Sequence, residues 1–191
     1  MYAKYMMTEN QKIKMRIWHP QQEVILKIWG EQASCYRFMH NNAYINYKKL
    51  NARFSLPVII LSTVSGTANF AQGTFPLSWQ TYVPLIIGAM NLFAAIMSTV
   101  SQFLKVSEMM ESHRVSSIQY GKVSRNIRLE LTLPINERSV NGDMFIETCK
   151  AEYDRLIEQS PNIPEKIIAS FKRDFPTPRD SSSFFKSKKK N

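Results

Sequence analysis

One long stretch without charged residues limits what this chain can fold into. From Phe54 to Leu104, 51 consecutive residues include no Asp, Glu, Lys or Arg, although charged residues make up 21% of the sequence. As helices, the apolar segments 54–71 and 82–104 would be about 27 Å and about 34 Å long, enough to cross a hydrocarbon core of about 30 Å. The pattern predicts a transmembrane hairpin with two spans. The alternative, a soluble helical hairpin in a large core, would hide an unusually long uncharged stretch.

The residues around the two segments predict their orientation. Between the segments, residues 72–81 combine glycine and proline with aromatic residues and include no Lys or Arg. Basic residues instead flank the outer ends of both spans, at Lys48, Lys49, Arg53, Lys105 and Arg114. By the positive-inside rule we expect an integral membrane protein with both termini in the cytosol.

The composition narrows the set of partners. The chain has 25 Lys and Arg against 15 Asp and Glu, a formal net charge of +10, which suits anionic lipid headgroups as well as nucleic acid. Because two spans are predicted, we expect a lipid bilayer with anionic headgroups as partner and no nucleic acid. Cys35 and Cys149 lie far apart in the sequence and would face the reducing cytosol, so we expect free thiols.

The residues outside the uncharged stretch predict helices and no strand. Apolar residues recur at steps of three and four in two segments, which we expect to pair as an antiparallel cytosolic stalk continuing the hairpin. On the first segment this stripe includes Ile25, Ile28, Tyr36 and Ala43. The predicted fold is an all-α membrane protein with a basic N-terminal segment (1–20), a cytosolic amphipathic helix (21–53), the hairpin (54–104), a second cytosolic helix (105–133), short C-terminal helices (134–175) and a basic, disordered tail (176–191).

Small and polar residues form a stripe along each predicted span. They recur at helical spacing in the second span at Gly88, Asn91, Ala95, Ser98 and Gln102, and in the first at Ser62, Gly66 and Asn69. Such stripes are used in two ways, either as close-packing contacts between helices or, repeated around a ring of subunits, as the lining of a narrow aqueous pore. The sequence leaves both interpretations open, and both predict a homo-oligomer.

No group of residues predicts catalysis or metal binding. His113, Ser117 and Tyr120 share one helical face, but no carboxylate is placed to orient the imidazole, and a polar seam that fixes helix register explains them better. The histidines and cysteines lack ligand spacings such as CxxC or HExxH. We therefore expect no enzyme, no cofactor and no metal.

The C-terminal residues interleave aromatic rings with lysines: Phe184, Phe185, Lys186, Lys188, Lys189 and Lys190. A tail of this composition binds anionic membranes by partition of the rings plus roughly 1 kcal/mol for each basic residue near the surface. Lysines at the third and fourth positions from a cytosolic C-terminus are also similar to the dilysine retrieval signal of the endoplasmic reticulum, which applies in a eukaryotic host. A plain solvated tail is the third interpretation.

The chain resembles the SLATT family of two-transmembrane proteins over roughly Gln21 to Leu131. The residues that carry the resemblance are the aromatic and basic stretch before the first span (Tyr36, His40, Tyr44 and Tyr47), the run from Leu56-Pro57 to Gly66, and the spacing from His113 to Tyr120. The string SPNIPEKI at 160–167 is similar to two-span proteins of large DNA viruses of eukaryotes. The resemblance implies a membrane effector that oligomerises into a pore and, in bacterial conflict systems, is coupled to nucleotide-signalling or sensor proteins. We expect no fused sensor domain.

Two functions of different class fit these observations. In the first, the chain self-associates into a pore or channel lined by the polar face of the second span. In the second, it is a non-conducting membrane scaffold or anchor, for example a viral membrane protein that links a bilayer to a partner such as a capsid through its cytosolic helices. An endoplasmic reticulum-derived or virion membrane is expected for a eukaryotic or viral source.

Overall fold

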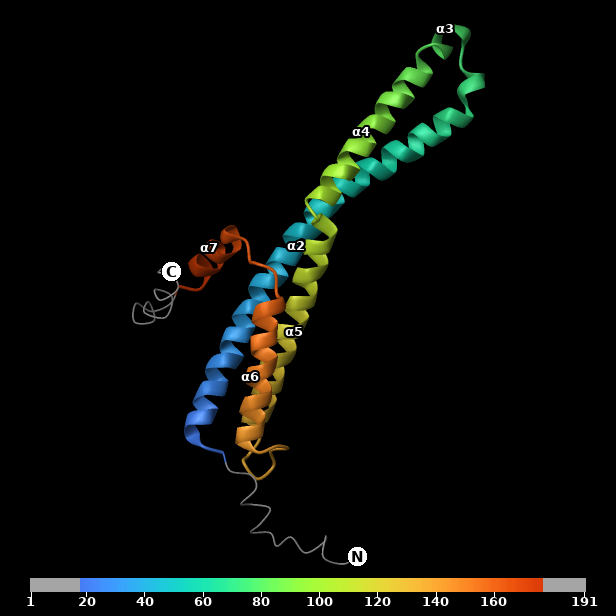
Figure 1. Ribbon diagram of the computed structural model, residues 1–191. Helices are drawn as coiled ribbons and strands as arrows, with labels where there is room; N and C mark the ends of the chain where they lie inside the picture. Colours follow the sequence, from blue (N-terminus) through green and yellow to red (C-terminus); the bar gives the residue numbers. More distant parts are fainter. Residues whose placement is uncertain (1–17, 177–191) are drawn as a thin grey trace, which may run out of the picture. The chain divides into compact units, whose positions relative to one another are not determined.

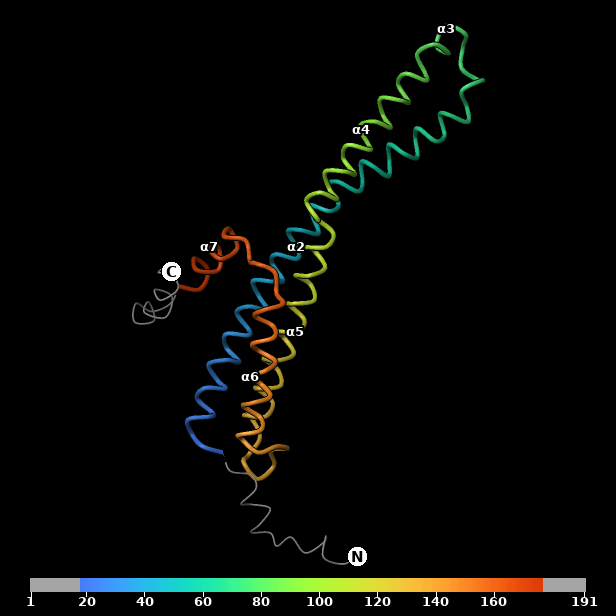
Figure 2. The backbone as a smooth tube through the Cα atoms, in the orientation of Figure 1, coloured from blue at the N-terminus to red at the C-terminus, as the bar shows by residue number. Residues whose placement is uncertain are grey.

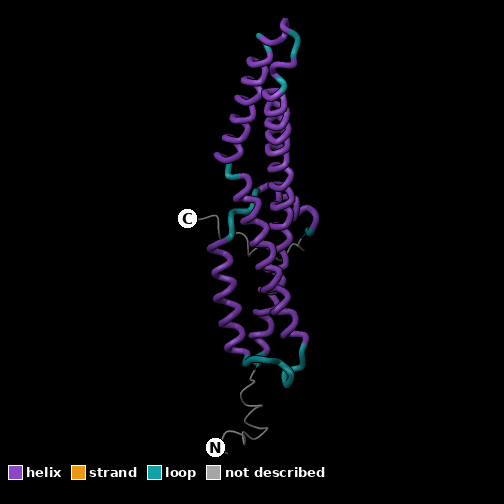
Figure 3. Tube along the Cα trace, turned by 90° about the vertical axis from the view of Figure 1, so that its right-hand side faces the viewer, coloured by secondary structure: helices purple, strands orange, loops and turns teal. Residues whose placement is uncertain are grey.

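The computed structural model describes residues 18–176, and within them every regular element is a helix (Figures 1 and 3). The prediction of an all-α fold is confirmed for this part of the chain. The chain divides into two compact units, which are described separately. The hairpin unit is Tyr44–His113, and the bundle unit combines Met1–Ala43 with Arg114–Asn191.

In the hairpin unit, the last part of α2 (Pro20–Phe70) and the whole of α4 (Val83–Phe103) run side by side in opposite directions (Figures 1 and 2). The 3-10 helix η1 (Gln72–Thr74) and the short helix α3 (Leu77–Gln80) connect them. The Gln80 side-chain amide donates a hydrogen bond to the Phe75 carbonyl across this connection. The turn thus lies among the breaker residues of the uncharged stretch.

One helical stretch of the described residues, within Leu77–Thr132, is long and apolar enough to cross a membrane, judged by length and composition. It contains α4, which matches most of the predicted second span. The first predicted span is a shorter helix than expected, because α2 ends at Phe70 and Ala71 already belongs to the turn. Residues 54–70 rise about 25 Å as a helix, near the lower limit for crossing a bilayer.

A change of backbone conformation separates α4 from α5 (Val106–Thr132). Lys105 has a φ of 49°, in the left-handed region that residues with a Cβ adopt only at a cost. The Lys105 N–H bonds to the Gln102 carbonyl at 2.9 Å, so the last turn of α4 tightens before the chain leaves it. The helix therefore breaks at the first charged residue after the uncharged stretch.

The bundle unit is built from the first part of α2, most of α5, and α6 (Gly142–Gln159), with α7 (Glu165–Asp174) beside them. α2 and α5 are antiparallel: the hydroxyls of Ser34 and Ser124 are 2.6 Å apart, and Ser117 donates to the Arg37 carbonyl. All three long helices contribute to one apolar core, made of Trp18, Leu26, Ala33, Tyr120, Val123, Ile127, Cys149, Tyr153 and Leu156.

The apolar stripe predicted for the first part of α2 is wrong at its start. Ile25 and Ile28 are exposed, whereas Leu26 and Ala33 are fully buried. This part of α2 has apolar residues around most of its circumference, so spacing alone does not select a face. The positions of α5 and α6 select it, and the stripe agrees with the packing from Tyr36, which lies against the core, to the buried Ala43.

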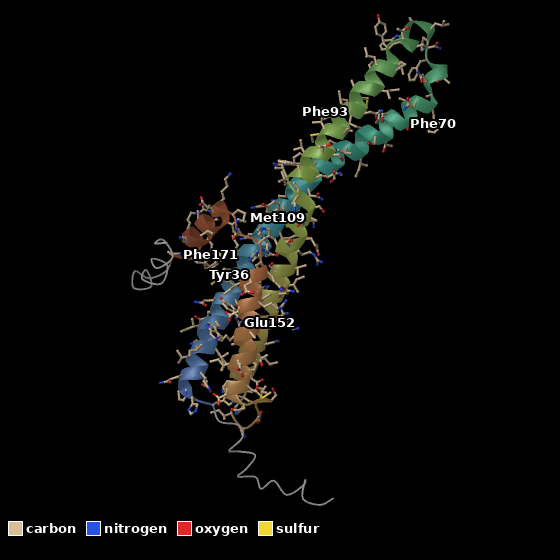
Figure 4. All side chains as sticks on the ribbon, viewed as in Figure 1. Tyr36, Phe70, Phe93, Met109, Glu152 and Phe171 are labelled. Carbon is tan, nitrogen blue, oxygen red and sulfur yellow. The ribbon has the colours of Figure 1, made fainter. Side chains whose placement is uncertain are left out.

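Aromatic rings and one buried arginine order the bundle unit. The Tyr120 ring stacks on Tyr36 and on His40, with ring centroids 5.1 Å and 5.5 Å away. The guanidinium of Arg138 lies over the Trp18 ring and forms an ion pair with Glu23, which joins the loop before α6 to the start of α2. At the other end of the unit, Phe171 and Phe175 pack against Phe38, which holds α7 on α2. Figure 4 shows Phe171 and Tyr36 in this unit.

Candidate functional site

The helix α4 carries three different faces. Val83, Ile87 and Ala94 are buried and form the face that packs within the hairpin unit. A second face has large apolar side chains that are more than half exposed, such as Leu92 and Phe93. The predicted stripe is the third face, in which Gly88, Asn91, Ala95 and Gln102 are exposed and Ser98 is half-buried.

Asn91 makes the polar contact between the two helices of the hairpin unit. The Ser65 hydroxyl, which is buried, donates a hydrogen bond of 2.7 Å to the side-chain oxygen of Asn91. Sequence reasoning placed Asn91 in the stripe but did not identify Ser65. The position of Ser65 in the sequence could have indicated this contact. Ser65 comes directly before the stripe residue Gly66, so its side chain lies about 100° around the helix from the stripe.

The stripes of the two helices fall on the same side of the hairpin. In α4 the stripe lies one residue after the packing positions, as Gly88 follows Ile87 and Ala95 follows Ala94, which is a rotation of about 100°. In α2 the stripe residue Gly66 likewise follows Ser65. Because the two helices are antiparallel, equal rotations turn both stripes toward one side of the pair. Along α4 one side is thus small and polar and the other large and apolar, whereas on α2 the exposed Ile59, two turns before Gly66, interrupts the stripe side.

No residue between 18 and 176 fills the space beside the two stripe glycines. A Cβ built on Gly66 or on Gly88 would meet no atom within 4 Å outside its own helix. Packing inside the hairpin therefore does not require glycine at either position. Ser62 and Asn69, the other predicted residues of the first stripe, are exposed as well.

His113, Ser117 and Tyr120 each have their own structural partner. The His113 ring is buried and stacks on Tyr47 at 5.4 Å, and burial lowers the pKa of its imidazole. The Ser117 hydroxyl bonds to the Arg37 carbonyl. Tyr120 is part of the aromatic stack, and burial raises the pKa of its hydroxyl. These contacts agree with the interpretation from the sequence that the three residues form a polar seam between helices.

The two cysteines are free thiols in the bundle unit, as expected. Burial among apolar side chains raises the pKa of Cys149 to about 11, with the charge of Glu130 as a smaller cause. Burial also raises the pKa of the Cys35 thiol. Among residues 18–176, no group of three His, Cys, Asp or Glu side chains is placed to hold a metal ion. The predicted lipid-contacting residues of the tail, 184–190, lie outside the described residues.

The comparisons with known proteins return nothing: the chain matches no family model, no curated protein and no solved structure.

Proposed function

We propose that this chain is a two-span integral membrane protein that self-associates in the bilayer and encloses a narrow pore with the small, polar side of its hairpin. In this assembly α4 and residues 54–70 of α2 both cross the membrane, and both termini are cytosolic, as the basic residues at the outer ends of the spans favour. The protein acts without catalysis. Its resemblance to the SLATT family is consistent with the same role.

The observation that carries the proposal is the two-sided hairpin. Large apolar chains such as Phe93 and Ile96 are about half exposed, which suits contact with lipid. On the opposite side, the polar side chain of Gln102 and the bare backbone of Gly88 are exposed. Lipid solvates such a polar side chain poorly. A ring of copies with this side turned inward would place Asn91, Ser98 and Gln102 next to water.

The hydrogen bond from Ser65 to Asn91 favours a second candidate, a non-conducting scaffold. The most polar residue in the middle of the stripe already has a partner within its own chain, which is the usual use of such residues in membranes. In a scaffold the stripes would pack solidly between copies, and the helices outside the membrane would attach a partner such as a capsid to an endoplasmic reticulum-derived or virion membrane.

Ion flux in liposomes separates the two candidates. We expect Gln102→Leu to reduce flux through the purified oligomer, because an apolar ring in a narrow lumen favours dewetting. Gln102 forms no side-chain hydrogen bond within the described residues, so the change leaves the hairpin intact. Phe93→Leu is the matched control on the opposite side of α4 and should leave flux unchanged.

The same preparation gives the contradicting outcomes. Wild-type oligomers that carry no current at any voltage or pH would reject the pore and leave the scaffold. A monomer by light scattering in nanodiscs would reject both, since each requires self-association. If wild type and Gln102→Leu carry the same ion flux, Gln102 does not line the lumen.

A further inference from the structure

Two arginines from different helices of the bundle unit converge on one glycine. Gly121 of α5 is buried. A Cβ added to it would lie 3.0 Å from Cδ and 3.4 Å from Nε of Arg37, and 3.3 Å from Nη1 of Arg125. Arg37 belongs to α2 and Arg125 to α5, and both side chains are exposed. The missing side chain of Gly121 therefore leaves the space in which the two guanidinium groups lie close together.

Neither Arg37 nor Arg125 has an ion-pair partner among the described residues. Neither guanidinium forms an ion pair or a hydrogen bond with another side chain between residues 18 and 176. The sequence around them explains why. α2 has no acidic residue after Glu31, and α5 has none between Glu111 and Glu130, where its basic residues are Arg114, Lys122, Arg125 and Arg128.

Two neighbouring guanidinium groups repel each other, so an arrangement without an anion is electrostatically unfavourable. Each group offers a rigid fork of N–H donors that matches the oxygens of a phosphate group. Arg37 is also fixed at its backbone, because its carbonyl accepts the Ser117 hydroxyl at 3.2 Å. We propose that Arg37 and Arg125 form a binding site for a phosphate group over Gly121, supplied by a soluble phosphate ester or by a lipid headgroup.

The site does not depend on whether the protein conducts ions. Its two arginines and its glycine all belong to the bundle unit, whereas the stripes belong to the hairpin unit. A binding measurement therefore tests the site separately from the pore.

Inorganic pyrophosphate is the first probe, titrated calorimetrically into the full chain in a neutral detergent and a chloride buffer. We expect saturable binding to the wild type, weakened roughly tenfold or more by Arg37→Gln or Arg125→Gln, because each removes a charge-assisted pair of hydrogen bonds. Arg128→Gln is the matched control: it removes the same charge from the same helix and should change the affinity little. Equal losses in all three variants would overturn the site and indicate a diffuse basic surface.

Gly121→Ala tests the geometry without removing a charge. Alanine favours the helix more than glycine does, so the fold should be kept, which far-UV circular dichroism can check. The new methyl group occupies the space of the guanidinium groups and should weaken pyrophosphate binding severalfold. Unchanged binding would overturn the role of the glycine and with it the site as described.

Nanodiscs separate the two sources of the phosphate group. If a soluble ester is the ligand, pyrophosphate binds with the same affinity in discs of zwitterionic lipid and in discs that contain phosphatidic acid. If the headgroup is the ligand, discs with phosphatidic acid compete with pyrophosphate for the wild type and for Arg128→Gln, which both keep the site. No heat of binding with pyrophosphate and no difference between the lipid compositions would overturn the proposal.

Discussion

The bundle unit and the hairpin unit treat their apolar residues in opposite ways. In the bundle unit, residues from three helices meet in a core in which Leu26 and Leu156 are fully buried. In the hairpin unit, Leu85, Leu92 and Phe103 are between 64% and 83% exposed, although α4 is the most apolar of the long helices that the structure describes. The bundle unit buries its core within one chain. The hairpin unit leaves large apolar side chains of α4 uncovered by the described residues.

This difference shows that exposure has to be interpreted together with its surroundings. Ile118 in the bundle unit and Phe93 in the hairpin unit have almost the same exposed fraction, 54% and 53%. Ile118 is flanked on its face by Arg114 and Lys122, and with Val115 it forms a small apolar spot on a polar surface. Phe93 is surrounded by further apolar residues. Variants at matched positions can test whether the two surfaces meet different solvents.

The largest effect is expected in the core of the bundle unit. Leu156→Ala should lower the free energy of unfolding by roughly 2–5 kcal/mol, since it removes a fully buried side chain and leaves a cavity. Ile157→Ala is the control in the next position of the same helix, where the side chain is 48% exposed. Denaturant titration followed by circular dichroism measures both. Equal losses would mean that the described core is not the one that holds the unit.

Charge introduced at the two matched positions should separate the units. Phe93→Lys should oppose membrane insertion of α4 by about 3 kcal/mol, the difference between Phe and Lys near the centre of a span. Ile118→Lys should leave insertion unchanged. Carbonate extraction of membranes that contain each variant gives the measurement. Full extraction resistance of Phe93→Lys would show that this face of α4 does not meet lipid.

Alkaline pH should act on the bundle unit through Cys149. Its pKa is raised to about 11 in the folded state, from 9.0 for an ordinary thiol. Below pH 9 the thiol is neutral in both states, and from pH 9 to 11 only the unfolded state loses the proton, so stability falls as the pH rises, by up to about 2 kcal/mol. Unfolding titrations of wild type and Cys149→Ala between pH 8 and 11 should show a shallower decline for the variant. Parallel curves would contradict the shift.

The smallest effect is expected at the polar contact of the hairpin unit. Ser65→Ala removes the hydrogen bond to Asn91 and should destabilise helix pairing by about 0.6 kcal/mol, the average for such bonds in membranes. Ser62→Ala, on the exposed stripe, should have no effect. A double-mutant cycle of Ser65→Ala with Asn91→Ala measures the coupling energy of the two side chains. A coupling energy of zero would show that this hydrogen bond does not stabilise the pair of helices.

Breaker residues in the sequence mark several helix boundaries of the described part. α6 begins directly after Asn141 and ends before Ser160-Pro161, and α7 begins directly after Pro164. The phase of α2 could not be predicted at Ile25 and Ile28, since only the placement of α5 and α6 decides which apolar residues face inward. The helix that carries the predicted first span ends at Phe70, one residue earlier than predicted, as helix ends depend on the local turn.

The candidate sites show the same limit. Spacing identified Asn91 and Gln102, because a stripe on one helix needs only the helical period. It missed Ser65, whose role depends on how the two helices are rotated against each other. It also missed Arg37 and Arg125, which lie 88 positions apart in the sequence and meet only because α2 and α5 are antiparallel and Gly121 has no side chain.

The break at Lys105 has a mechanical consequence for α4. A continuous helix transmits rotation about its axis along its whole length, because every hydrogen bond resists twisting. At Lys105 the left-handed conformation interrupts this ladder between α4 and α5. We therefore expect α4, a rod of 21 residues, to turn about its axis more easily relative to the start of α5 than one continuous helix would.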